Sequence, residues 1–117
     1  MNIKGIDSLT LEVADIARAK RFYHEVFDLP IISENTQQVT LRCGHQQLKL
    51  TLSKSTNKEK SINFSIATST PLPDVLNHLA NYYIPIIDTI SNTDSTSKKN
   101  IIIVQDYDTN TIEIVAL

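Results

Sequence analysis

Alternating apolar and polar residues predict a strand at the start of each half of the chain. Apolar side chains recur at every second position, which is typical of a strand buried on one face. They are Leu9, Leu11 and Val13 in the first half and Ile62, Phe64 and Ile66 in the second. The polar residues between them are Ser8, Thr10 and Glu12, and then Ser61, Asn63 and Ser65. Each strand is therefore expected to show one face to a core and the other to solvent or a ligand.

Helical spacing of apolar residues follows each of these strands. Asp15 is a good N-cap for the first helix, and Thr70-Pro71 is a good cap and first-turn pair for the second. The apolar stripe of the first helix is Ile16, Ala19, Tyr23, Val26 and Phe27, and that of the second includes Leu72, Val75, Leu76 and Leu79. Both helices are expected to pack one face on a sheet.

Three further strands are predicted after each helix. Their ranges are 29–32, 39–43 and 48–52 in the first half and 84–87, 101–105 and 111–116 in the second. Leu29-Pro30-Ile31-Ile32 is echoed by Ile84-Pro85-Ile86-Ile87. The chain thus reads as an internal duplication within a single domain, 1–117, with module one at 6–52, a polar linker at 53–60 and module two at 61–116. Such a repeat gives a pseudo-two-fold axis, where a ligand cleft is expected.

Composition removes several function classes. The 117 residues carry 11 Lys and Arg against 13 Asp and Glu, so no basic face for nucleic acid is expected. The two glycines, Gly5 and Gly44, leave no Gly-rich phosphate loop. The one cysteine, Cys43, permits no internal disulfide and no cysteine-based zinc site. No signal peptide or membrane span is predicted, so we expect a cytoplasmic protein.

Two stretches of the chain resemble the vicinal oxygen chelate superfamily, the group of glyoxalase I, the bleomycin-resistance proteins and the extradiol dioxygenases. The first is Ile6–Asp15 followed by Phe22-Tyr23-His24-Glu25-Val26-Phe27, and the second is the closing hairpin at Asp106–Ile114. The resemblance implies an α+β fold of two tandem βαβββ modules, forming a curled mixed sheet around a cleft. It also implies a homodimer.

The resemblance further implies four cleft side chains that hold one divalent ion in the metal-dependent members, usually two His and two Glu. The matching positions here are Ser8, Lys49, Ser61 and Glu113. Only Glu113 keeps a metal-ligand type, because a serine hydroxyl is a poor ligand and a protonated lysine has no lone pair. His24, His45 and His78 lie on three different predicted elements. We therefore expect no metal and no cofactor.

Strand alternation and the resemblance together give the candidate ligand-binding cleft. Its residues are Ser8, Thr10, Glu12, Lys49, Ser61, Asn63 and Glu113, with Tyr107 at the mouth. Gln47, Thr51, Ser65, Thr111 and Val115 share the same predicted faces. Lys49 and Glu113 occupy equivalent repeat positions with opposite charge, so we hypothesise an ion pair between them. The same polar faces are also compatible with a sheet that is simply covered by water.

The favoured function is a metal-independent protein that binds a small polar molecule, sequestering or sensing it, with no catalytic residue. A glyoxalase-like lyase or dioxygenase that uses a divalent metal is the first alternative. A dimerisation module without a ligand is the second. Where the family has glycine in its turns, this chain has Asp28, Asp108 and Asn110, which tolerate left-handed backbone better than most residues.

Overall fold

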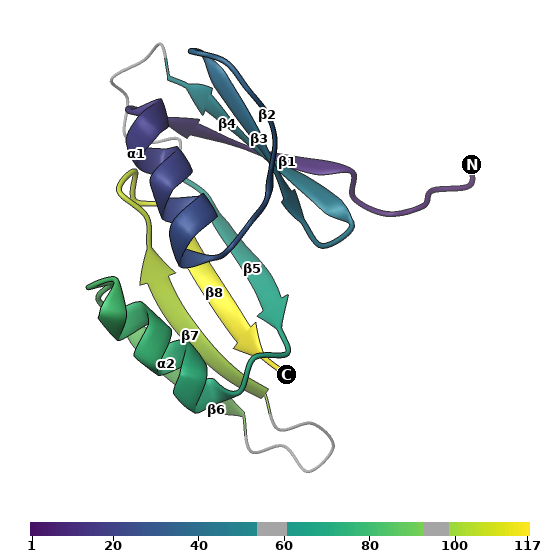
Figure 1. The fold of residues 1–117 in the computed structure, drawn as a ribbon. Helices are drawn as coiled ribbons and strands as arrows, with labels where there is room; N and C mark the ends of the chain where they lie inside the picture. Colours follow the sequence, from purple (N-terminus) through teal and green to yellow (C-terminus); the bar gives the residue numbers. More distant parts are fainter. Residues whose placement is uncertain (54–60, 93–98) are drawn as a thin grey trace. The chain divides into compact units, whose positions relative to one another are not determined.

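The computed structural model describes residues 1–53, 61–92 and 99–117 (Figure 1). The chain divides into two compact units, Met1–Lys60 and Ser61–Leu117. Each contains one helix-bearing βαβββ module with a four-stranded mixed sheet, so the predicted α+β fold of two tandem modules is confirmed. Positions 54–60 of the predicted linker lie outside the described residues.

The sheet of the first unit has the strand order β1-β4-β3-β2. Its β1 pairs with β4 in parallel, and the other pairs are antiparallel. The elements are β1 (Ser8–Val13), α1 (Ile16–Arg21), the π-helical turn η1 (Phe22–Val26), β2 (Ile31–Glu34), β3 (Gln38–Cys43) and β4 (Gln46–Leu52). The helix α1 packs on β3 and β4, and thereby covers one face of the sheet.

The first helix begins as predicted. The Oδ1 atom of Asp15 accepts a hydrogen bond from the backbone N–H of Arg18 at 3.0 Å, which satisfies one of the unpaired donors of the first turn. After Arg21 the helix widens into η1, which buries Phe22, Tyr23 and Val26. The rings of Phe22 and Tyr23 meet edge to face with centroids 5.0 Å apart. This contact anchors the end of the helix in the core.

Strand β2 starts two residues later than predicted. Leu29 and Pro30 form the connection instead, held by hydrogen bonds from the Arg42 backbone N–H to the Pro30 carbonyl at 2.8 Å and between His24 Nδ1 and the Leu29 carbonyl, also 2.8 Å. The strand then contains a bulge, since Ile31 pairs with Leu41 but Ser33 pairs with Thr40. An extra residue of this kind shifts the alternation of the side chains that follow it.

The sheet of the second unit repeats the same pattern, with the order β5-β8-β7-β6. Its elements are β5 (Asn63–Thr68), α2 (Leu72–Asn81), β6 (Asp88–Asn92), β7 (Lys99–Gln105) and β8 (Thr111–Ala116). The parallel pair is β5 with β8, which matches β1 with β4 in the first unit. Buried residues of the sheet are Ile102, Val104, Ile112, Ile114 and Ala116, and α2 buries Val75 and Leu79.

Two sequence predictions for the second unit were wrong. The stretch 84–87 precedes β6, which begins at Asp88, although the Ile87 N–H already donates to the Ile103 carbonyl at 2.8 Å. Thr70 does not cap α2: the N-cap is Pro71, and no side chain caps the helix. A proline fixes its own backbone φ at a value suited to the start of a helix. The pair Thr70-Pro71 therefore marks the start of α2 through its proline and not through a threonine cap.

Left-handed backbone occurs at three described residues other than glycine, namely Asp28, Tyr83 and Thr109, with φ of 55°, 57° and 63°. The expectation for Asp28 is confirmed. In the last turn the strained residue is Thr109, rather than Asp108 or Asn110. These two neighbours instead take part in a hydrogen-bond network around Asp106, whose Oδ1 accepts from both backbone N–H groups at 2.9 Å.

Within the described ranges, no helix is long and apolar enough to cross a membrane.

Candidate functional site

The first sheet presents one polar face, on the side that its buried residues do not occupy. Leu11, Val13, Leu48 and Leu50 are buried, whereas Thr10 and Glu12 are exposed. The alternation predicted for β1 and β4 is therefore confirmed. The strand register aligns Thr10 with Lys49 on β4, and Lys49 with Thr40 on β3. Three strands thus place hydroxyl and ammonium groups in one row across the sheet.

The bulge in β2 extends this polar face to the edge of the sheet. It brings Ser33 opposite Thr40, so the row continues onto a fourth strand. Glu34 then pairs with Val39, a core residue, and its Oε2 lies 2.7 Å from Nζ of Lys20 on α1. The register shift therefore adds the Ser33 hydroxyl to the polar face. It also directs the Glu34 carboxylate to the opposite face, where it contacts Lys20 of α1.

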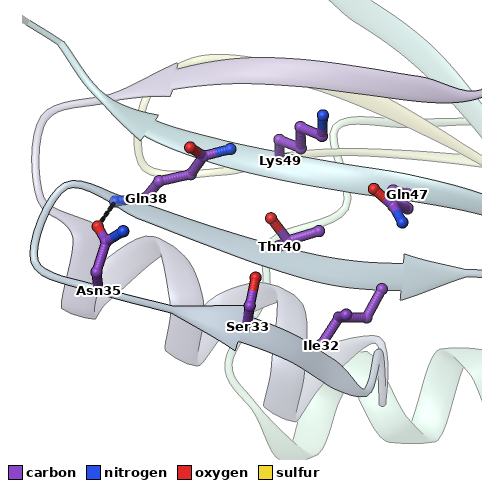
Figure 2. Close-up of a pocket in the computed structure, with 7 residues that line it drawn as sticks. All are labelled: Ile32, Ser33, Asn35, Gln38, Thr40, Gln47 and Lys49. Carbon is purple, nitrogen blue, oxygen red and sulfur yellow. Dashed lines mark hydrogen bonds between the residues drawn. The ribbon is translucent and has the colours of Figure 1, made fainter.

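A pocket of about 330 Å³ lies on this polar face. Its lining residues come from β2, β3, β4 and the turn between β2 and β3: Ile32, Ser33, Asn35, Gln38, Thr40, Gln47 and Lys49. Figure 2 shows the side chains of Ser33 and Thr40 side by side on adjacent strands, with Lys49 beyond them. The Oδ1 atom of Asn35 accepts from the backbone N–H groups of Gln37 and Gln38 at 2.8 and 2.9 Å, which fixes the turn at one end of the pocket.

Two of the polar lining residues, Thr40 and Lys49, have side chains without a partner among the described residues of the first unit. Thr40 is only 8% exposed, yet its hydroxyl makes no hydrogen bond with any described residue of the first unit. Lys49 is half-buried and makes no ion pair with those residues either. The Thr40 hydroxyl is not among the fully buried atoms without a partner, so it remains accessible from the pocket. The pocket therefore offers a hydroxyl and a cation to a bound molecule.

The corresponding face of the second sheet is less polar than predicted. The hydroxyl of Ser65 donates to Oε2 of Glu113 at 2.9 Å, and these residues pair directly across β5 and β8. On β7, however, Ile103 lies opposite Glu113, and Ile101 lies opposite Val115. The second sheet therefore carries apolar side chains from β7 beside the polar residues predicted for β5 and β8.

The remaining predicted site residues take the following places. Ser8 and Asn63 each begin their strand, β1 and β5, and the register makes them equivalent in the two repeats. Ser61 is exposed and precedes β5, so Asn63 and not Ser61 is the counterpart of Ser8. Tyr107 lies in the turn between β7 and β8 and is 60% exposed.

Lys49 and Glu113 do occupy equivalent positions of the two repeats. Each lies on the last strand of its module, paired with the first strand at Thr10 and Ser65, respectively. Lys49 belongs to the first unit and Glu113 to the second. An ion pair between them stays a prediction.

The donor set at the family's metal positions does not fit a divalent ion. Ser8, Lys49 and Asn63 supply a hydroxyl, an ammonium and an amide, and Glu113 supplies the one carboxylate. No three His, Cys, Asp or Glu side chains gather into a possible metal site in the part of the chain that the structure describes. His24, moreover, is engaged by the Leu29 carbonyl.

Sequence reasoning missed the part of the pocket that comes from β2 and β3. The missed lining residues are Ile32, Ser33, Asn35, Gln38 and Thr40. The alternation of Gln38, Thr40 and Arg42 with buried Val39 and Leu41 would have placed β3 on the polar face. No comparable signal marks Ser33, because its direction depends on the bulge.

The chain is similar in sequence or in fold to several known proteins. Virulence protein STM3117 of Salmonella typhimurium is 30% identical over 122 residues, covering 97% of this chain and 85% of that protein. An integron cassette protein from V. cholerae superimposes with a TM-score of 0.81 at 26% identity, covering 99% of this chain and 97% of the other. Lactoylglutathione lyase from Agrobacterium tumefaciens shares the fold, with a TM-score of 0.81 at 18% identity and coverage of 98% and 95%.

The family model of the Glyoxalase/Bleomycin resistance protein/Dioxygenase superfamily matches residues 5–114. This span includes the whole first module, with every strand of the polar face, and the second module as far as Ile114 of β8. The chain therefore belongs to the Glyoxalase/Bleomycin resistance protein/Dioxygenase superfamily.

Proposed function

We propose that this protein binds a small polar molecule reversibly and without a metal ion, so as to sequester or sense it. The observation that carries the proposal is the pocket of about 330 Å³ on the polar face of the first sheet. Its volume is at the lower end of the range of small-molecule sites, about 300–1,000 Å³. Hydroxyl, amide and ammonium groups dominate its lining, which suits a ligand that is itself polar.

Metal independence is supported by the chemistry of the family's ligand positions. Lys49 stands at one of them, and its positive charge would repel a divalent cation. The likeness to lactoylglutathione lyase is one of fold, at 18% identity. It does not carry lyase chemistry to a chain whose ligand positions differ.

The proposal is tested on protein treated with EDTA and checked for metals by mass spectrometry. A library of small polar compounds is then screened for a rise in melting temperature, because a ligand that binds only the folded state must stabilise it. We expect at least one compound to raise the melting temperature equally with and without EDTA. A stoichiometric divalent ion that supports turnover would contradict the proposal and favour the enzyme.

A homodimer and a cytoplasmic location are part of the same proposal. Family resemblance supports the dimer, and the single cysteine, Cys43, is consistent with a reducing compartment. Light scattering coupled to size-exclusion chromatography tests the dimer: a mass of one chain at micromolar concentration would contradict it.

A further inference from the structure

The pocket on the polar face of the first sheet is lined by hydrogen-bond donors, and none of its described lining residues is acidic. Its polar lining consists of two hydroxyls, three carboxamides and the ammonium of Lys49. We infer that it selects a small hydroxylated organic anion, whose carboxylate or phosphate is bound by Lys49. This inference rests on the proposed function, and adds to it the charge of the ligand.

The charges around the pocket support an anion. Arg42 lies on the same face of β3, two residues from Thr40, and is therefore a diagonal neighbour of Lys49. Like Lys49, Arg42 makes no ion pair with any described residue of the first unit. A cation that no carboxylate neutralises attracts anionic ligands, and the attraction weakens with added salt.

Of the two carboxylates on neighbouring strands, one is directed away from this face and the other lies on it beside the pocket. Glu34, at the end of β2, is turned to the helix side of the sheet, where Lys20 neutralises it at 2.7 Å. Glu12 lies on β1 opposite Thr51, which makes it, like Arg42, a diagonal neighbour of Lys49, but it does not line the pocket. Lys49 is thus the charge nearest to Thr40, its direct cross-strand partner.

The hydroxyl groups expected on the ligand follow from Thr40 and its neighbours. Thr40 is 8% exposed and its hydroxyl has no partner among the described residues of its unit. Ser33 pairs with it across β2 and β3, so two hydroxyls stand beside the ammonium of Lys49 (Figure 2). Hydroxyls both donate and accept, and therefore match the hydroxyls of a polyol chain.

Calorimetric titration of EDTA-treated protein with two matched pairs of compounds tests the inference. The pairs are gluconate with sorbitol, and glycerol 3-phosphate with glycerol. We expect at least one anion to bind about tenfold or more tightly than its neutral partner, because hydrogen bonds to charged groups are the stronger class. Tighter binding in the first or the second pair identifies the carboxylate or the phosphate as the recognised group.

Variants separate the role of Lys49 from a general effect of charge. Lys49→Met keeps the length of the side chain and is expected to lose about tenfold or more in anion affinity. Lys20→Met removes the same charge on the helix side of the sheet and is expected to bind as the wild type does. Melting curves check that both variants fold, and Lys49→Gln replaces Lys49→Met if the latter does not.

Two results would overturn the inference and leave the proposed function standing: equal affinity for the anion and its neutral partner in both pairs, or unchanged anion affinity in Lys49→Met. Binding of neither anion would also overturn it. The proposed function is then tested by the melting-temperature screen of polar compounds. Stabilisation by a neutral compound in that screen would still support it.

Discussion

Asp106 and Asn110 face each other inside the turn between β7 and β8, where Nδ2 of Asn110 donates to Oδ2 of Asp106 at 2.8 Å. Asn110 is 2% exposed, and its Oδ1 accepts from the Ile62 backbone N–H at 2.9 Å. The pair therefore links the hairpin to the residue just before β5. A turn without glycine is stabilised here by side-chain hydrogen bonds.

Removing the carboxylate of this pair should destabilise the second unit. Asp106→Ala leaves a buried amide and two backbone N–H groups without acceptors, so we expect a loss of about 2–4 kcal/mol in the free energy of unfolding. Urea denaturation measures it. The matched control is Asp7→Ala, an exposed site before β1, which should change stability by less than about 0.5 kcal/mol. Equal effects of the two variants would contradict the structural role of Asp106.

The two helices should respond differently to loss of their predicted capping residues. Asp15→Ala removes the 3.0 Å bond to Arg18 and should cost about 1 kcal/mol, whereas Asp15→Asn should retain most of the stability. Thr70→Ala should cost less than about 0.5 kcal/mol, because no side chain caps α2. Chemical denaturation of the three variants checks this order. A larger loss at Thr70 than at Asp15 would show that the caps are assigned wrongly.

Relieving left-handed backbone should stabilise the protein. Tyr83 follows α2 with φ of 57° and is 90% exposed, so its ring contributes little burial. Tyr83→Gly should raise stability by up to about 1 kcal/mol, since glycine adopts this conformation without steric cost. Tyr82→Gly, at φ of −96°, should lower it instead. The melting temperatures of both variants and the wild type test this. A melting temperature of Tyr83→Gly below that of the wild type would contradict the prediction.

The single thiol should react slowly. Burial raises the pKa of Cys43 above its ordinary value of 9.0, because desolvation disfavours the thiolate. Iodoacetamide at pH 8 should therefore alkylate the folded protein more slowly than the urea-unfolded chain. As the folded state holds its proton to higher pH, this thiol contributes stability below the unfolded pKa and loses that contribution as pH rises towards the folded pKa. Equal alkylation rates in the two states would refute the assignment.

Most of the fold could be predicted from the sequence, because its pattern is local. The alternation around Leu11 and Val13 and the cap at Asp15 specify β1 and the start of α1 without tertiary information. Strand β2 begins later than the apolar run at Leu29 and Pro30 predicts. The Leu29 carbonyl bonds to His24 and not to β3, and the Pro30 carbonyl accepts from Arg42 of β3 just before the paired residues begin at Ile31. Apolar character alone does not separate a strand from the segment that leads into it.

The candidate site was predictable only in part, for a physical reason. Lys49 and Thr10 follow from alternation on adjacent strands, and the register confirms that they pair. Ser33 reaches the pocket because one extra residue in β2 reverses the direction of its side chain. Likewise, the resemblance matched Ser61 with Ser8, whereas the pairing of β5 with β8 makes Asn63 the equivalent residue.

Metal-independent binding at the pocket of the first sheet is tested most directly by nuclear magnetic resonance. Amide spectra of EDTA-treated, isotope-labelled protein are recorded while gluconate or glycerol 3-phosphate is added. We predict the largest shift changes at Ser33, Thr40 and Lys49, which line the pocket, with saturation and no need for added metal. Changes centred on other residues, or changes that require a divalent ion, would contradict this assignment.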